Sequence, residues 1–162
     1  MTQLNRAELD PKSQLFEQIG QVRTIMLGLA GGADQMQPMT ALGTDRGRII
    51  MFTARDSELG RASPGPAWLT VTGKDHDYHA FAKGQLSTCD DPVLRDALWN
   101  PFVGAWFPEG KDDPRVLMVE FHPRTAEIWA SEGNAIVFGL DILKATVTGR
   151  QPDVGVRRTV TF

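Results

Sequence analysis

The chain has 162 residues, the length of one domain, and 41% of them are hydrophobic, which excludes a largely disordered protein. Seventeen Lys and Arg against twenty Asp and Glu give a net charge of −3, which argues against a nucleic-acid partner because such binding depends on basic side chains at phosphates. The apolar runs fall far short of the ~20 residues of a membrane span, the N-terminal stretch lacks a secretory signal pattern and Cys89 is the single cysteine, so we expect a cytoplasmic protein with no membrane partner.

The N-terminal third of the chain predicts one helix followed by three strands. Asp10 and Pro11 are typical of an N-cap and a first helical position, and apolar residues at helical spacing continue toward Gly20. The three strands are short runs of β-type residues at 23–30, 36–43 and 48–55. Turns at 31–34 and 45–47 separate these runs, and the short connections predict an antiparallel meander.

The middle of the chain predicts a strand pair between short helices. The segments are a helical turn at 56–61, strands at 67–72 and 78–85, and helices at 92–99 and 102–107. Pro64 ends the helical turn, Asp90 or Asp91 caps the following helix before Pro92, and Pro101 separates the last two helices.

The C-terminal third predicts a hairpin, a helix and a tail. Strands at 115–121 and 124–130 are expected to pair around His122-Pro123, and the apolar spacing of 135–147 is typical of a helix. The chain after Gly149 is expected to be poorly ordered. About seven short strands with helices indicate a small β-barrel, a single domain over residues 1–149 with a C-terminal tail at 150–162.

The motifs of common active sites are missing from the sequence. The glycines of Gly28–Gly32 lack the G-x-G-x-x-G spacing of a dinucleotide site. His76 and His79 lie in a charged turn, which we interpret as a solvated loop and not as a metal site, and Cys89 has no base near it in sequence. The sequence therefore nominates no catalytic residue and no metal ligand, a pattern typical of proteins whose cofactor supplies the chemistry.

Six segments together resemble the general stress protein 26 family, a branch of the pyridoxamine 5′-phosphate oxidase-like, FMN-binding split β-barrels. They are Gln37–Met39, Phe52–Glu58, Leu98–Pro101, Ala105–Pro108, Asp112–Pro114 and Ala126–Trp129. The W-F-P-x-G-x-D-D-P segment and the A-E-x-W strand are the most specific, and the resemblance covers roughly residues 11 to 149. It implies a mainly β fold with peripheral helices, a split β-barrel that assembles as a homodimer.

The resemblance also implies a bound flavin, FMN or FAD, in a cleft between two protomers. It places ten residues at the flavin: Gln37, Pro38, Met39, Thr40, Phe52, Thr53, Ala54, Arg55, Ser57 and Trp129. Residues 37–40 and 52–54 would lie along the isoalloxazine ring and the ribityl chain. Ser57 would contact the phosphate, and Trp129 would close the site near the ring. Backbone polar groups can read the pyrimidine edge and aromatic side chains can cover a flat ring. The alternative for Phe52 and Trp129 is ordinary core packing.

Two positions depart from the family pattern. Gln37 stands where the family usually carries Arg, and Leu59 stands where it usually carries Lys. Both cations would bind the flavin phosphate, and hydrogen bonds to charged groups contribute about 1.5–3 kcal/mol each, so their loss would weaken binding by ~3–6 kcal/mol. Arg55 and Arg61 flank the same turn and are candidates to replace them. The alternative is that both arginines are simply solvated.

The resemblance leads to two functional hypotheses. The first is a homodimeric flavin-binding stress protein, with flavin-dependent oxidoreductase or flavin reductase chemistry as its candidate activity. The second is a dimeric stress-associated binding module that has lost the flavin phosphate site and is not an enzyme. Haem binding is a third, weaker alternative. Pyridoxamine phosphate oxidation is not expected, because the remaining basic pair, Arg157-Arg158, lies in the predicted tail.

Overall fold

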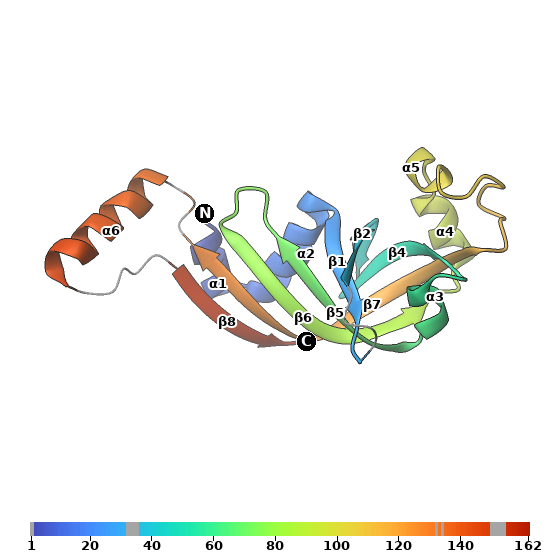
Figure 1. Cartoon of the computed structure of the whole chain (residues 1–162), viewed down its shortest axis with the longest axis horizontal. Coiled ribbons are helices and arrows are strands. Elements are labelled where there is room, and N and C mark those ends of the chain that lie inside the picture. The colour runs from blue at the N-terminus through green and yellow to red at the C-terminus, as the bar shows by residue number, and fades with distance from the viewer. Residues whose placement is uncertain (1, 32–35, 132, 134, 150–154) are drawn as a thin grey trace.

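The computed structural model describes residues 2–31, 36–131, 133, 135–149 and 155–162 (Figure 1). Over these residues the chain forms one antiparallel sheet with helices around it. The strands are β1 (Thr24–Leu29), β2 (Met36–Thr40), β3 (Gly43–Asp45), β4 (Arg48–Ala54), β5 (Gly65–Thr72), β6 (Tyr78–Thr88), β7 (Val116–Ser131) and β8 (Gly155–Thr161). The helices are α1 (Gln3–Leu9), α2 (Pro11–Val22), α3 (Glu58–Ala62), α4 (Pro92–Leu98), α5 (Pro101–Gly104) and α6 (Ala135–Thr148).

The sheet curls because its two end strands are neighbours in the chain. The strand order is β2-β1-β5-β6-β7-β4-β3, with β8 paired to β7 off this path. Only Ala41 and Leu42 separate β2 from β3, and their N–H groups donate to Arg23 O of the β1 side (2.7 Å) and Ile50 O of β4 (2.9 Å). The mainly β fold with peripheral helices is therefore confirmed. The predicted meander is confirmed for β1 and β2, which pair antiparallel, but is wrong for its third strand, because β4 pairs with β3 and β7 and not with β2.

The main core lies between α2 and the inner face of the sheet. Leu15 and Ile19 of α2 are fully buried there with Tyr78 and Phe121 of the strands. Asp10 caps α2 by accepting from Ser13 N at 3.1 Å, and the helix ends at Arg23, whose φ of 62° lies in the left-handed region. The predicted N-cap and helix are confirmed. Helix α1 was not predicted, since Ala7 is its one buried residue and its apolar periodicity is weak.

A second, smaller cluster lies on the other face of β4. Val103, Phe107 and Val116 are buried there, and Phe52 packs edge-on against Trp99 with ring centroids 5.7 Å apart. Asp91 caps α4 by accepting from Leu94 N at 2.9 Å, and Asn100 caps α5 through Phe102 N and Val103 N. The predicted helix after Pro92 is confirmed, while the helix expected at 102–107 is only residues 101–104.

The predicted hairpin around His122-Pro123 is wrong, because residues 116–131 form one continuous strand, β7. The register of β6 against β7 shifts between Lys83 and Gly84, and Gly84 faces Pro123 at this bulge. Proline is tolerated within a sheet at such a bulge. A Cβ on Gly84 would lie 2.1 Å from His122 O, so the close approach of the two strands requires glycine.

The prediction of a poorly ordered C-terminal tail is wrong for residues 155–161. Residues 155–161 form β8, which pairs with β7 from Ser131↔Gly155 to Thr125↔Thr161, and Val160 is buried. Isolated from its partner, the stretch carries too few apolar residues to indicate a strand, and pairing with β7 supplies its backbone partners. Residues 150–154, and the turn expected at 32–34, lie outside the described residues. Helix α6 confirms the helix predicted over 135–147, and in the described part of the chain no helix is both long and apolar enough to cross a bilayer.

An ion-pair network ties β4 to β7. Arg48 of β4 pairs with Glu120 of β7, and His122 Nε2 lies 2.9 Å from Glu120 Oε1. The side chains of Arg48 and Glu120 are 21% and 15% exposed. Burial acts to raise the pKa of Glu120, but the hydrogen bonds from His122 and Arg48 outweigh burial and hold that pKa below its ordinary value. His122 thus lies on a strand, contacting Glu120, and not in the predicted turn.

We expect Gly84→Ala to lower the free energy of unfolding by about 1–3 kcal/mol, because the added methyl group forces the two strands apart. Chemical denaturation measures this change. Gly20→Ala is the matched control: a Cβ there meets nothing within 4 Å, and alanine in an exposed helix is expected to raise stability by about 0.5–1 kcal/mol. Equal effects of the two substitutions would contradict the close approach at the bulge.

We expect Glu120→Gln to destabilise the protein by about 1.5–3 kcal/mol at neutral pH, since it removes charge-assisted hydrogen bonds. The folded-state pKa of Glu120 is depressed, so its stabilisation is present above the unfolded-state pKa and is lost as pH falls through the folded-state pKa. The difference between wild type and variant should therefore shrink in acid. Denaturation curves at pH 7 and near pH 3 test this, and a difference independent of pH would contradict it.

Candidate functional site

The turn between β4 and α3 holds three of the predicted flavin residues together. Ser57 Oγ accepts from Gly60 N at 3.0 Å and so caps α3, while it donates to Ala54 O at 2.6 Å. Thr53 Oγ1 lies 2.9 Å from the same hydroxyl. A Cβ on Gly60 would lie 2.3 Å from Ala54 O, so this turn closes only around glycine. The Ser57 hydroxyl is therefore engaged in shaping the turn.

Strand β2 lies beside this turn. Gln37, Pro38 and Thr40 are exposed and Met39 is buried. Because β2 stands at one end of the sheet path, the main-chain groups of its edge away from β1 are not used in the strand pairing described here. Such an edge can hydrogen-bond the polar rim of a heterocycle.

The two positions that depart from the family pattern meet at one small cavity. A space of about 50 Å³ is lined by Leu27, Leu29, Met36, Gln37, Glu58 and Leu59. Leu59 is 3% exposed and belongs to the main core. A lysine at this position would therefore carry its charge into an apolar environment, so leucine is a packing residue here. The sequence could not show this, because burial depends on residues from distant strands.

Arg55 and Arg61 both lie at the turn and both are exposed. Arg55 Nε donates to Pro114 O at 3.3 Å, and Arg61 donates to Asp56 O. Among the residues that the structure describes, no carboxylate forms an ion pair with either guanidinium. The turn therefore carries two guanidinium groups that could bind a phosphate, beside the exposed carboxylates of Asp56 and Glu58.

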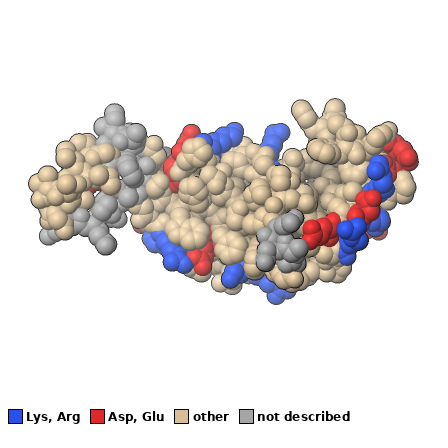
Figure 2. All heavy atoms as spheres, in the orientation of Figure 1, with Lys and Arg blue, Asp and Glu red and all other residues tan. Residues whose placement is uncertain are grey.

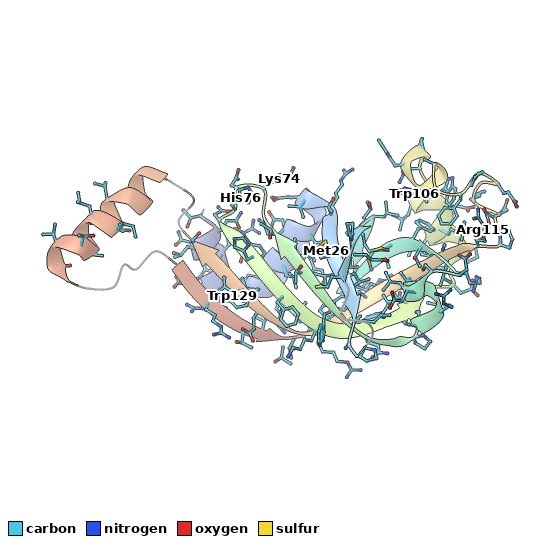
Figure 3. The ribbon with its side chains drawn as sticks, viewed as in Figure 1. Met26, Lys74, His76, Trp106, Arg115 and Trp129 are labelled. Atoms are coloured by element: carbon cyan, nitrogen blue, oxygen red, sulfur yellow. The ribbon has the colours of Figure 1, made fainter. Side chains whose placement is uncertain are left out.

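Trp129 lies far from the turn. Met118, the β7 partner of Phe52, is eleven residues before Trp129, which corresponds to about 36 Å of strand. Figure 3 shows Trp129 toward one end of the molecule, while Arg115 at the start of β7 lies at the other end. Trp129 is 39% exposed, and the Arg157 guanidinium lies 5.5 Å from its ring centroid. One protomer thus brings residues 37–40 and 52–57 together but leaves Trp129 apart from them.

Trp129 belongs to an apolar patch on the outer face of the sheet that sequence reasoning missed. Its other members, in alternate positions to the buried core residues, are Met26, Trp68 and Phe81. Trp68 and Phe81 pack edge-on with centroids 6.1 Å apart, and Met26, Trp68 and Trp129 remain 37–39% exposed. Strand alternation alone is the signal that could have found this patch. Exposed apolar surface of this kind typically marks an interaction surface.

A second cavity, of about 270 Å³, lies between α4 and the start of β7. Its lining is Arg55, Thr88, Cys89, Asp90, Asp91, Pro92, Arg95 and Val116–Met118. Ligand pockets typically measure about 300–1,000 Å³, so this space is small for a whole flavin. Burial and the charge of Glu120 raise the pKa of the Cys89 thiol, so it is not an activated nucleophile.

His76 and His79, which the sequence places in a charged turn, belong to no cluster of metal ligands among the described residues. His76 sits in the β5–β6 loop with φ of 58°, and His79 Nδ1 lies 3.3 Å from Thr72 Oγ1. In the described ranges, no three side chains among His, Cys, Asp and Glu come close enough together to hold a metal ion. The turn itself offers hydrogen-bonding groups, the guanidinium groups of Arg55 and Arg61, and the carboxylates of Asp56 and Glu58.

Comparison with known proteins identifies the family of the chain. The family model described as pyridoxamine 5′-phosphate oxidase like matches residues 10–153. A structure from Jannaschia sp. CCS1 that bears the name general stress protein 26 is 33% identical, with 94% of this chain and 99% of that chain covered and a TM-score of 0.81. The general stress FMN/FAD binding protein from Xanthomonas citri is 34% identical, with 75% and 89% covered and a TM-score of 0.66.

A third structure, from Xanthomonas campestris pv. campestris, bears the name of a general stress family protein. It is 34% identical to this chain, with 78% of this chain and 90% of that chain covered and a TM-score of 0.67. No curated protein matches the chain. The family model and the extent of the structural match together show that the chain belongs to the pyridoxamine 5′-phosphate oxidase-like family, within the general stress protein 26 group that its sequence resembles.

Proposed function

We propose that the chain binds a flavin, FMN or FAD, in a site completed by a second copy of itself. The observation that carries the proposal is the juxtaposition of the open edge of β2 with the β4–α3 turn, which carries the exposed Arg55 and Arg61. The 34% identical relative from Xanthomonas citri is an FMN/FAD binding protein, which supports the same ligand here. The cavities described within one protomer, about 270 and 50 Å³, are smaller than a typical ligand pocket of about 300–1,000 Å³, which favours a shared site.

In this proposal the flavin ring meets β2 and the phosphate meets the turn. Main-chain groups of residues 37–40 read the polar edge of the ring, and residues 52–54 lie along the ribityl chain. Arg55 and Arg61 take the place of the two missing cations, because each already lies at the turn with its charge unneutralised by a carboxylate. Phe52 packs against Trp99 and holds β4 in place, which positions the turn.

The separation of Trp129 from the turn supports the second copy. If Trp129 covers the ring, a second protomer must supply it, because about 36 Å of strand separates it from Phe52 within one chain. A two-fold dimer in which the protomers lie antiparallel brings the Trp129 end of each to the turn of the other. The outer-face patch of Met26, Trp68, Phe81 and Trp129 would be covered in such a dimer.

A bound flavin would supply hydride or electron transfer, and the chain would bind and orient it. The described residues offer no activated thiol, and no pyridoxamine phosphate oxidase activity is proposed. The second candidate function is a dimeric binding module without flavin. It is favoured by the buried Leu59, which fills the position of the missing lysine, and by the Ser57 hydroxyl already engaged in capping α3.

We expect the wild type to bind FMN or FAD, and Arg55→Gln with Arg61→Gln to weaken binding of both at least tenfold, because charged hydrogen bonds to phosphate are lost. Quenching of flavin fluorescence measures the affinity. Riboflavin, which lacks the phosphate, should be bound equally by wild type and variant, and Lys74→Gln is a control that removes one positive charge elsewhere. No binding of FMN or FAD at about 50 μM would favour the module without flavin.

We expect mixed dimers to restore a site that each parent lacks. Trp129→Ala and the Arg55→Gln, Arg61→Gln double variant should each bind FMN weakly. If Trp129 and the arginines come from different protomers, random mixing leaves about a quarter of the sites intact. Unfolding and refolding the two variants together, followed by FMN titration, tests this. Absence of restored sites in a mixture that forms dimers would mean that one chain supplies all these residues.

A further inference from the structure

Helix α6 is an apolar arm, and among the described residues no other helix or strand makes an extensive contact with it. Asp141 and Lys144, which pair at 3.7 Å, are the charged residues among its fourteen. Leu140, Leu143 and Val147 form one stripe at i, i+3 and i+7 and are 53%, 60% and 79% exposed. Figure 1 shows the helix projecting beyond the end of the sheet, and Figure 2 shows that end of the molecule largely free of charged atoms in this view.

Such a helix needs a covering surface. Isolated helices shorter than about 12–15 residues are marginal in water, and Gly139 with two threonines lowers the helix propensity further. A helix with an apolar face this broad is normally buried against protein.

A matching apolar surface lies at the opposite end of the molecule. Val93 of α4, Phe102 of α5 and Trp106 after α5 are 81%, 86% and 80% exposed, and we call these three residues the α4–α5 tip. Figure 3 shows Trp106 at the end remote from α6. The tip sits over the outer face of β4, the strand that leads into the candidate site.

We propose that α6 of each protomer packs its Leu140, Leu143 and Val147 stripe on the α4–α5 tip of a second copy. This inference rests on the proposed function, since the dimer that brings Trp129 to the partner's turn also carries α6, which follows β7, to the partner's β4 end. The contact is reciprocal, so one two-fold operation covers both helices and both tips.

The area of this contact is too small for a whole dimer interface and fits an addition to a larger one. A helix of fourteen residues is about 21 Å long and about 10 Å wide, so two such contacts bury about 800 Å², counting all four surfaces. Specific interfaces bury about 1,200–2,000 Å². The arm therefore adds to the contact between outer sheet faces and does not replace it.

A lipid surface fits α6 less well. A length of about 21 Å falls short of the ~30 Å core of a bilayer. Helices that lie on membranes carry several basic residues on their polar face, whereas the one lysine of α6 is paired with Asp141.

Cross-linking between differently tagged chains tests the proposal. One chain carries Cys89→Ser and Leu143→Cys, the other Cys89→Ser and Phe102→Cys, and the two are refolded together and treated with a short bismaleimide. We expect a cross-linked heterodimer, and a much weaker one when Lys74→Cys replaces Phe102→Cys. Absence of the heterodimer, or an equal yield with the control, would overturn the proposal.

A second measurement does not depend on introduced cysteines. Leu143→Asp with Val147→Asp should raise the dimer dissociation constant at least tenfold by sedimentation, whereas Ala145→Asp, on the other side of the helix, should leave it nearly unchanged. Equal effects, or binding of the wild type to anionic vesicles that the double variant loses, would overturn the proposal. Flavin titration separates the two ideas: cross-links without flavin binding defeat only the proposed function, and a flavin-binding dimer without cross-links defeats only the arm.

Discussion

Strand β7 is the element on which the other parts of the sheet depend. Its sixteen residues pair with β6 along most of their length, with β4 in the first half and with β8 in the second. A strand of this length can pass the bulge opposite Gly84 because glycine leaves room for His122 O, which would lie 2.1 Å from a Cβ at that position. The Arg48–Glu120 pair then joins β4 to β7 beside that bulge. The β4–α3 turn and Trp129 are consequently held at opposite ends of one rigid strand.

This separation explains why one protomer presents only part of the proposed site. The turn that carries Arg55 and Arg61 adjoins β2 through Glu58 and Leu59, and the aromatic side chain that would cover a ring lies about 36 Å of strand away. The unpartnered surfaces follow the same division, with α6 at one end and the α4–α5 tip at the other. A single two-fold arrangement of two copies would bring Trp129 to the partner's turn and α6 to the partner's α4–α5 tip. The flavin proposal and the arm proposal therefore lead to one geometry.

The phosphate end of the proposed site shows how packing and binding compete for the same positions. Leu59 contributes to the main core, and the Ser57 hydroxyl caps α3, so neither is free to serve a ligand without a cost in stability. Positive charge at this turn resides instead in two exposed arginines that donate to main-chain carbonyls. Exchange of such a neutral acceptor for a phosphate would strengthen the hydrogen bond, because a charged acceptor contributes more than a carbonyl.

The sequence by itself determined the features that depend on near neighbours: the caps at Asp10 and Asp91, the helices after Pro11 and Pro92, the apolar helix predicted over 135–147, and the motifs that indicated the family. Hydrogen bonds of caps and helical periodicity span only a few residues, so they can be read locally. Only the tertiary structure decided that His122-Pro123 continues a strand, that residues 155–161 join the sheet, that Leu59 is buried and that Trp129 lies far from the turn. Each of these depends on which distant strands pair, and strand pairing is set by contacts between residues far apart in the chain.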